Sequence, residues 1–197
     1  MMVATILVQA ETDLSDFPVH PFWDFSLDVY MSDGVGQACL ELQNEHQLDV
    51  NILLYCMWVG ASGRGSLTVA QMAAVNEAVN EWHQDVVRAL RAIRVRMKRV
   101  EGATPEPLTE SLRQSIQKTE IDCEHAEQLM LAASVDLTAD NIKTISDRLA
   151  DSVSNISIYF AGFGKVSDVD RRNLTLILNV VFGDLTAEQV EAAAVKI

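Results

Sequence analysis

Six cationic side chains fall within residues 88–99 and form the densest group of positive charge in this sequence. On a helix with about 100° per residue, five of them share an arc of about 140°, and apolar residues lie opposite. Arginine suits bidentate contact with carboxylate or phosphate groups. We therefore expect this face to bind an acidic protein segment or a phosphate-bearing partner. The candidate binding residues are Arg88, Arg91, Arg94, Lys98 and Arg99.

The charge of the rest of the chain offers a simpler interpretation of the same helix. The formal net charge is −13, yet residues 64–99 hold seven bases and only three acids. Charge runs are common on solvated helix faces, and the acidic helices of this protein could pair with part of the basic face. An acidic chain is repelled by nucleic acid at long range, although a local patch still binds. A protein partner is therefore preferred, and an RNA- or ribosome-associated role is an alternative.

The run from Asp122 to Glu127 offers carboxylate, thiol and imidazole groups that could bind a metal ion. No second His or Cys cluster completes a set of four ligands, so we interpret the run as an exposed acidic face and expect no metal site. The four histidines are scattered through the sequence, and no G-x-S-x-G signature is present. The sequence thus indicates no catalytic residue and no cofactor, and it carries no positive sign of an enzyme.

A second candidate site lies on the most apolar segment, residues 49–60. A helix that is apolar on nearly every side must be wrapped by other helices, so this segment is predicted to be the centre of the fold. Asn51 within it needs hydrogen-bond partners and is expected to cap a neighbouring helix, or else to contact a ligand. Tyr55 and Trp58 are expected in the core. A small-molecule or catalytic pocket near Asn51, Tyr55 and Trp58 is the alternative to the basic face.

The spacing of apolar residues predicts an all-α fold, a compact bundle of six to eight helices around the helix at 49–60. Separate helices are expected at 69–82 and 83–100, and another at 140–160 with Thr138 or Asp140 as its cap. Residues 168–182 favour a helix, although a buried strand is the other interpretation. We expect a loosely ordered leader at 1–20, a core unit at 21–102 and a C-terminal unit at 103–197 that packs on it in one globular domain.

The composition is that of a folded domain, with 49% apolar and 22% charged residues. Three cysteines at wide spacing favour free thiols in a reducing compartment over a disulfide framework. The longest uncharged run, residues 50–63, is shorter than the ~20 residues of a membrane span. We therefore expect a cytoplasmic protein without membrane attachment, and a homodimer is possible because acidic helical proteins often bury a helix face.

Three sequence blocks carry a resemblance to a known family. They are Phe22-Trp23-x-Phe25-Ser26-x-x-x-Tyr30, then Gly34-Val35 with Ala38-Cys39-Leu40-x-Leu42-Gln43, and then Leu48-Asp49-Val50-Asn51-Ile52-Leu53-Leu54 with Trp58 and Gly60. Residues 22–100 resemble an uncharacterised bacterial domain of unknown function, found mainly in proteobacteria. The resemblance implies a small cytoplasmic helical protein and brings no known activity, cofactor or site residue. The function expected from the residues is therefore a non-enzymatic interaction or regulatory module.

Overall fold

The helix predicted at the centre of the fold is present and is buried along its length. The computed structural model describes residues 17–98 and 106–197. Helix α3 spans Val50–Ala61, and Asp49 caps it by accepting a hydrogen bond from the Asn51 backbone N–H. Every residue from Asn51 to Gly60 is buried. A segment apolar on all sides thus becomes the axis around which the other helices pack, as its sequence requires.

The described residues are helical and contain no strand, which confirms the all-α prediction. The bounds of the helices are α1 Pro21–Tyr30, α2 Val35–His46, α4 Val69–Trp82, α5 Arg88–Met97, α6 Glu106–Ser134, α7 Ile145–Phe160, α8 Asp168–Val181 and α9 Ala187–Ala194. The segment that could have been a strand is α8. No helix in the described ranges is long and apolar enough to cross a membrane.

Two helix boundaries differ from the prediction. Helices α4 and α5 are continuous rather than separate, because a π-helical turn at His83–Val87 joins them; we call it the π turn. Helix α7 begins after Thr144 rather than near Asp140, because Thr144 forms a capping box with Asp147. The carboxylate of Asp140 instead accepts a hydrogen bond from the Ile142 N–H in the preceding turn.

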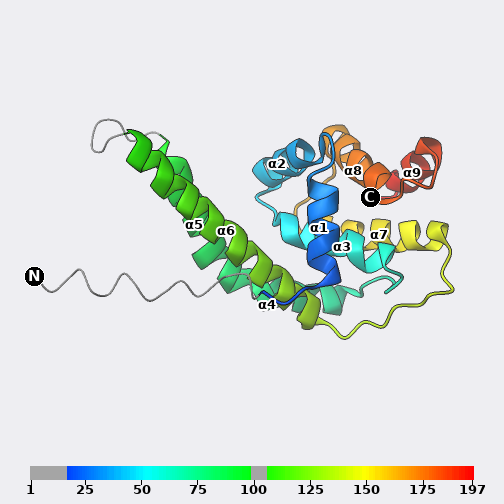
Figure 1. Cartoon of the computed structure of the whole chain (residues 1–197). Helices are drawn as coiled ribbons and strands as arrows, with labels where there is room; N and C mark the ends of the chain where they lie inside the picture. Colours follow the sequence, from blue (N-terminus) through cyan, green and yellow to red (C-terminus); the bar gives the residue numbers. More distant parts are fainter. Residues whose placement is uncertain (1–16, 99–105) are drawn as a thin grey trace, which may run out of the picture.

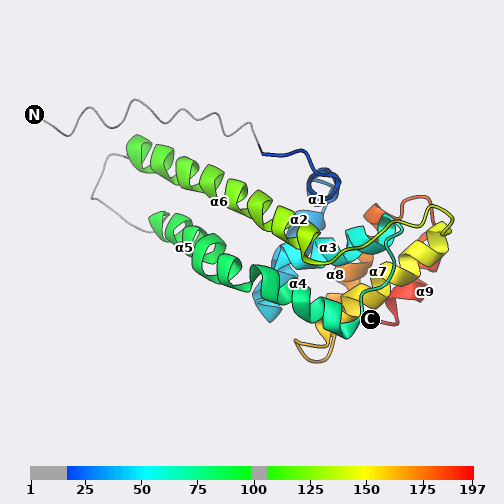
Figure 2. The same ribbon diagram turned by 90° about the horizontal axis from the view of Figure 1, so that it is seen from below.

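Helices α5 and α6 run side by side and extend away from the remaining helices as a two-helix arm (Figure 1). A view turned by 90° shows the same arm, with α4 continuing from α5 toward α7 (Figure 2). The other end of α6 enters the core, where Leu131 is fully buried. One hydrophobic cluster includes side chains from both predicted units, from Phe22 to Ala194.

The tightest packing of the core is between α3 and α7. A Cβ added to Gly60 would lie 2.4 Å from the Ser152 backbone N and 2.7 Å from its Cα, so only glycine lets the two helices approach this closely. Asn155 on α7 is fully buried and donates to the carbonyls of Cys56 and Gly65. It also accepts from the Leu67 N–H, and so it fixes the loop that follows α3.

Candidate functional site

Three ionisable side chains meet inside the protein at the junction of α3, α6 and the π turn. Asp49 is the cap of α3, His83 is the first residue of the π turn, and Glu127 lies on α6. His83 Nδ1 is 3.0 Å from Glu127 Oε1 and 3.1 Å from Asp49 Oδ2. Glu127 is fully buried, and the other two are more than nine-tenths buried. We call Asp49, His83 and Glu127 the buried triad.

A layer of hydrogen bonds orients both carboxylates of the buried triad. Asn51 donates its backbone N–H to Asp49 Oδ1 at 2.8 Å and its Nδ2 to Glu127 Oε2 at 2.6 Å. Gln128 Nε2 in turn donates to Asn51 Oδ1. The Tyr159 hydroxyl accepts from the Asp49 N–H at 2.9 Å and donates to the Asp49 carbonyl. One oxygen of each carboxylate is therefore held, and the other faces the imidazole.

The electrostatics of the buried triad favour a proton between its members. Burial alone would lower the pKa of His83, but the hydrogen bonds and charges of Asp49 and Glu127 outweigh burial and raise it. Burial raises the pKa of Glu127, and the nearby charge of Asp49 raises it further. A buried group of two carboxylates and one imidazole thus holds protons, or another cation, more tightly than the separate side chains do.

A surface pocket of about 420 Å³ reaches one member of the buried triad and lies between α2 and the rod formed by the π turn and α5. His83 lines this pocket, and so does Leu48, the neighbour of Asp49. The volume is in the range of small-molecule sites, about 300–1,000 Å³. We call it the arginine pocket. Its lining consists of Gln43, Asn44, Gln47, Leu48, His83, Arg88, Arg91, Ala92, Val95 and Arg96.

A family model described as a protein of unknown function (DUF2390) matches residues 21–131. The chain belongs to the DUF2390 family. No curated protein and no solved structure matches the chain. The buried triad and the whole lining of the arginine pocket fall inside the matched region, whereas Tyr159 lies beyond it.

In this DUF2390 protein, two of the four predicted binding residues that the structure describes are paired with carboxylates of the chain itself. Arg91 Nε is 2.9 Å from Glu120 Oε1, and another of its nitrogens is 2.6 Å from Glu124 Oε1. Its third nitrogen donates to Gln43. Arg94 forms two hydrogen bonds with Glu120. Part of the positive charge on α5 is thus balanced by acids of α6, as the simpler interpretation held.

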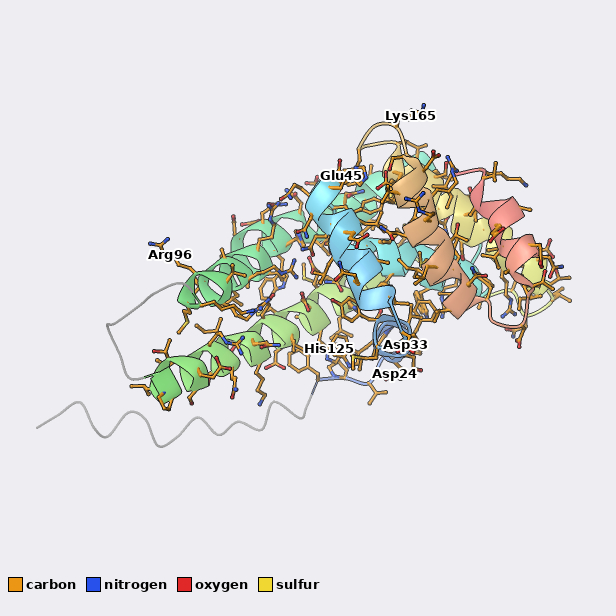
Figure 3. The ribbon with its side chains drawn as sticks, turned by 90° about the horizontal axis from the view of Figure 1, so that it is seen from above. Asp24, Asp33, Glu45, Arg96, His125 and Lys165 are labelled. Atoms are coloured by element: carbon orange, nitrogen blue, oxygen red, sulfur yellow. The ribbon has the colours of Figure 1, made fainter. Side chains whose placement is uncertain are left out.

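The other cations of α5 face outward. Arg88 donates to the neutral side-chain amides of Gln84 and Gln47, and no carboxylate in the described ranges pairs with it. Arg96, which was outside the predicted set, is exposed and points away from α6 (Figure 3). Lys98 is also exposed, and the predicted Arg99 lies outside the described residues. The structure therefore brings Arg88, Arg91 and Arg96 together at one pocket and turns Arg94 toward α6.

The three residues predicted to form an alternative pocket, Asn51, Tyr55 and Trp58, do not lie together at one site. Tyr55 and Trp58 line a second surface pocket of about 300 Å³, where the Arg64 guanidinium lies 4.2 Å from the centre of the Trp58 ring. Asn51 belongs instead to the hydrogen-bond layer of the buried triad. It caps no neighbouring helix there, so the capping prediction is wrong. Its amide bridges the side chains of two α6 residues.

Sequence reasoning missed the buried triad because it considered its members one at a time. The Asp122–Glu127 run is not an exposed acidic face: Glu127 is buried, and the His125 ring stacks on Trp23 at 4.0 Å between centroids. One available signal was the spacing of Glu120, Glu124 and Glu127, which places them on one helix face. An acidic stripe of this kind indicates a basic or imidazole partner on a neighbouring helix.

Proposed function

We propose that this protein is a non-enzymatic interaction module that binds an acidic segment of a partner protein at the arginine pocket. The proposal rests on the hydrogen-bond partners of Arg88. Arg88 lines the pocket, and its guanidinium donates to two neutral amides, whereas no carboxylate in the described residues pairs with it. A guanidinium pre-positioned in this way loses little rotamer freedom when it binds a carboxylate.

The remaining lining of the pocket supports the same ligand chemistry. Arg96 adds a second positive charge that no carboxylate among residues 17–98 and 107–197 pairs with, and the side chains of Asn44 and Gln47 supply neutral hydrogen-bonding groups. Leu48, Ala92 and Val95 add apolar surface on which a peptide can rest. The chain as a whole is strongly acidic and repels an acidic partner at long range, whereas the positive charge at this pocket attracts it locally.

The test is direct binding of a fluorescein-labelled Glu-rich peptide, followed by fluorescence anisotropy. Replacing Arg88 and Arg96 together by Gln should weaken binding at least tenfold, which is about 1.4 kcal/mol. The matched control replaces Lys165 and Arg172 by Gln; both are exposed, lie outside the pocket lining, and carry the same total charge. Equal losses in the two double variants would show nonspecific attraction and contradict the proposal.

Two further probes separate this proposal from its alternatives. A phosphorylated peptide and a single-stranded RNA of the same net charge are measured in the same buffer. The acidic peptide should bind more tightly than both. If the RNA bound most tightly, with an affinity that falls steeply with salt, the nucleic-acid role would replace the proposed one.

A further inference from the structure

We propose that the buried triad of Asp49, His83 and Glu127 is a binding site for one divalent transition-metal ion, with Zn²⁺ as the first candidate. The ligand atoms are Asp49 Oδ2, His83 Nδ1 and Glu127 Oε1. This site is distinct from the arginines that carry the proposed function, so either proposal can fail without the other.

Two of the three distances within the buried triad match those between ligands of one metal ion. The three ligand atoms all lie within 4.8 Å of one another. Ligands about 2.1 Å from one ion, at angles between octahedral and tetrahedral, lie about 3.0–3.4 Å apart. The imidazole nitrogen is 3.0 Å and 3.1 Å from the two carboxylate oxygens. An ion can therefore take the place of the Nδ1 proton without a large movement of the three side chains.

Asp49 Oδ2 is an unpartnered atom aimed into this site. It is buried and has no hydrogen-bond donor with acceptable geometry in the described ranges, although His83 Nδ1 is close. A single Nδ1 proton cannot serve two carboxylates, and its better hydrogen bond goes to Glu127. A buried polar atom without a partner costs about 1–3 kcal/mol. A metal ion bonded to all three atoms removes that deficit.

Hydrogen bonds from neighbouring side chains and backbone orient the two carboxylates of the buried triad. Asn51 holds the second oxygen of both carboxylates, and Gln128 holds the amide of Asn51. Hydrogen bonds of this kind fix ligating carboxylates in metal sites. One imidazole with two carboxylates suits Zn²⁺ and its first-row neighbours, whereas Ca²⁺ and Mg²⁺ prefer oxygen ligands alone. His83 also lines the arginine pocket, which gives an ion a route from solvent.

The experiment is a calorimetric titration of the full chain with ZnCl₂ after treatment with a chelator. We expect one Zn²⁺ per chain in the unaltered protein. Glu127→Gln keeps the shape of the side chain and should weaken Zn²⁺ binding about 100-fold, because loss of even an outer partner costs about 10- to 100-fold. The matched control is His46→Gln, since His46 faces only one carboxylate, Asp170, and should leave Zn²⁺ binding unchanged.

X-ray absorption spectroscopy on the unaltered protein with one equivalent of Zn²⁺ tests the ligands even if a variant fails to fold. The expected shell contains nitrogen and oxygen only, with scattering from a single imidazole. No binding, sulfur in the shell from Cys123, or unchanged affinity in Glu127→Gln would each overturn the proposal. In those cases the buried triad is an imidazolium held between two carboxylates.

Discussion

Glu120 should hold the two-helix arm together, and Glu120→Gln should destabilise the protein. The carboxylate of Glu120 is nearly fully buried and accepts hydrogen bonds from Arg91 Nε and from Nε and a terminal nitrogen of Arg94. The amide oxygen of Gln can still accept from Arg91 Nε and from the terminal nitrogen of Arg94, but its NH₂ group then faces Arg94 Nε, which is also a donor. One charge-assisted hydrogen bond is therefore lost, worth about 1.5–3 kcal/mol, and the other two lose the charge of the carboxylate.

Water reduces that loss, because the side chains of Arg91 and Arg94 are 27% and 19% exposed and can be rehydrated. We therefore expect the free energy of unfolding at pH 7 to fall by about 2 kcal/mol, below the 3–5 kcal/mol of a fully buried pair. For a chain of this length that corresponds to a fall in Tm of about 4–8 °C. Urea unfolding followed by far-UV circular dichroism measures it.

The pH dependence separates the charge of Glu120 from its shape. Burial would raise the pKa of Glu120, but the hydrogen bonds and charges of Arg94 and Arg91 outweigh burial and hold it below the ordinary value of 4.5. Its stabilisation is therefore present above pH 4.5 and is lost as the pH falls through the folded-state pKa. The difference between Glu120→Gln and the unaltered protein should shrink in acid.

The control for this prediction is Glu110→Gln on the same helix. Glu110 is exposed and pairs with Arg113 one turn away, so its replacement should leave the unfolding curve unchanged. If Glu120→Gln unfolds at the same urea concentration as the unaltered protein at pH 7, Glu120 does not hold the arm together. If the two proteins differ equally at pH 7 and in acid, the loss does not come from the charge of Glu120.

Three further predictions concern the core. Gly60→Ala places a methyl group against the backbone of α7 and should lower the free energy of unfolding by about 2 kcal/mol, despite a helix-propensity gain of about 1 kcal/mol. A melting curve unchanged from that of the unaltered protein would contradict this. Asn155→Leu leaves one backbone N–H and two carbonyls without their partner. The free energy of unfolding measured in urea should therefore fall by about 3 kcal/mol. A fall of less than about 1 kcal/mol would mean that water replaces the amide. In the native protein a thiol reagent should modify only Cys123, and slowly, because burial raises the pKa of all three thiols and fully encloses Cys39 and Cys56. Rapid labelling of all three thiols without denaturant would disprove the closed core.

The helices were predictable where one local pattern decided them. A run of apolar residues after a capping Asp49 could only be a buried helix, and α3 forms there. The start of α7 was not predictable, since both Asp140 and Thr144 can cap a helix. Thr144 prevails because Asp147 three residues later completes its capping box, while the Asp140 backbone N–H is held by the Gly63 carbonyl far away in the sequence.

For the sites, the sequence predicts only the residues that share a face of one helix. The sequence places the arginines on one face of α5, but which of them meet α6 depends on how the two helices pack. Arg91 and Arg94 meet acids there, and Arg88 meets Gln47 of another segment. The members of the buried triad are separated by 34 and 44 residues, so no local spacing brings them together.

The π turn determines the direction in which the side chains of α5 point. A π turn closes hydrogen bonds from residue i to i+5 and so holds one residue more than an α turn. Each residue in a helix rotates the next side chain by about 100°, so the surplus residue turns all of α5 by roughly that angle relative to α4. Deleting one residue from His83–Val87 would swing Arg91 and Arg94 off the acids of α6 while every residue of α5 kept its identity. The number of residues in the π turn thus decides which side chains of α5 face α6.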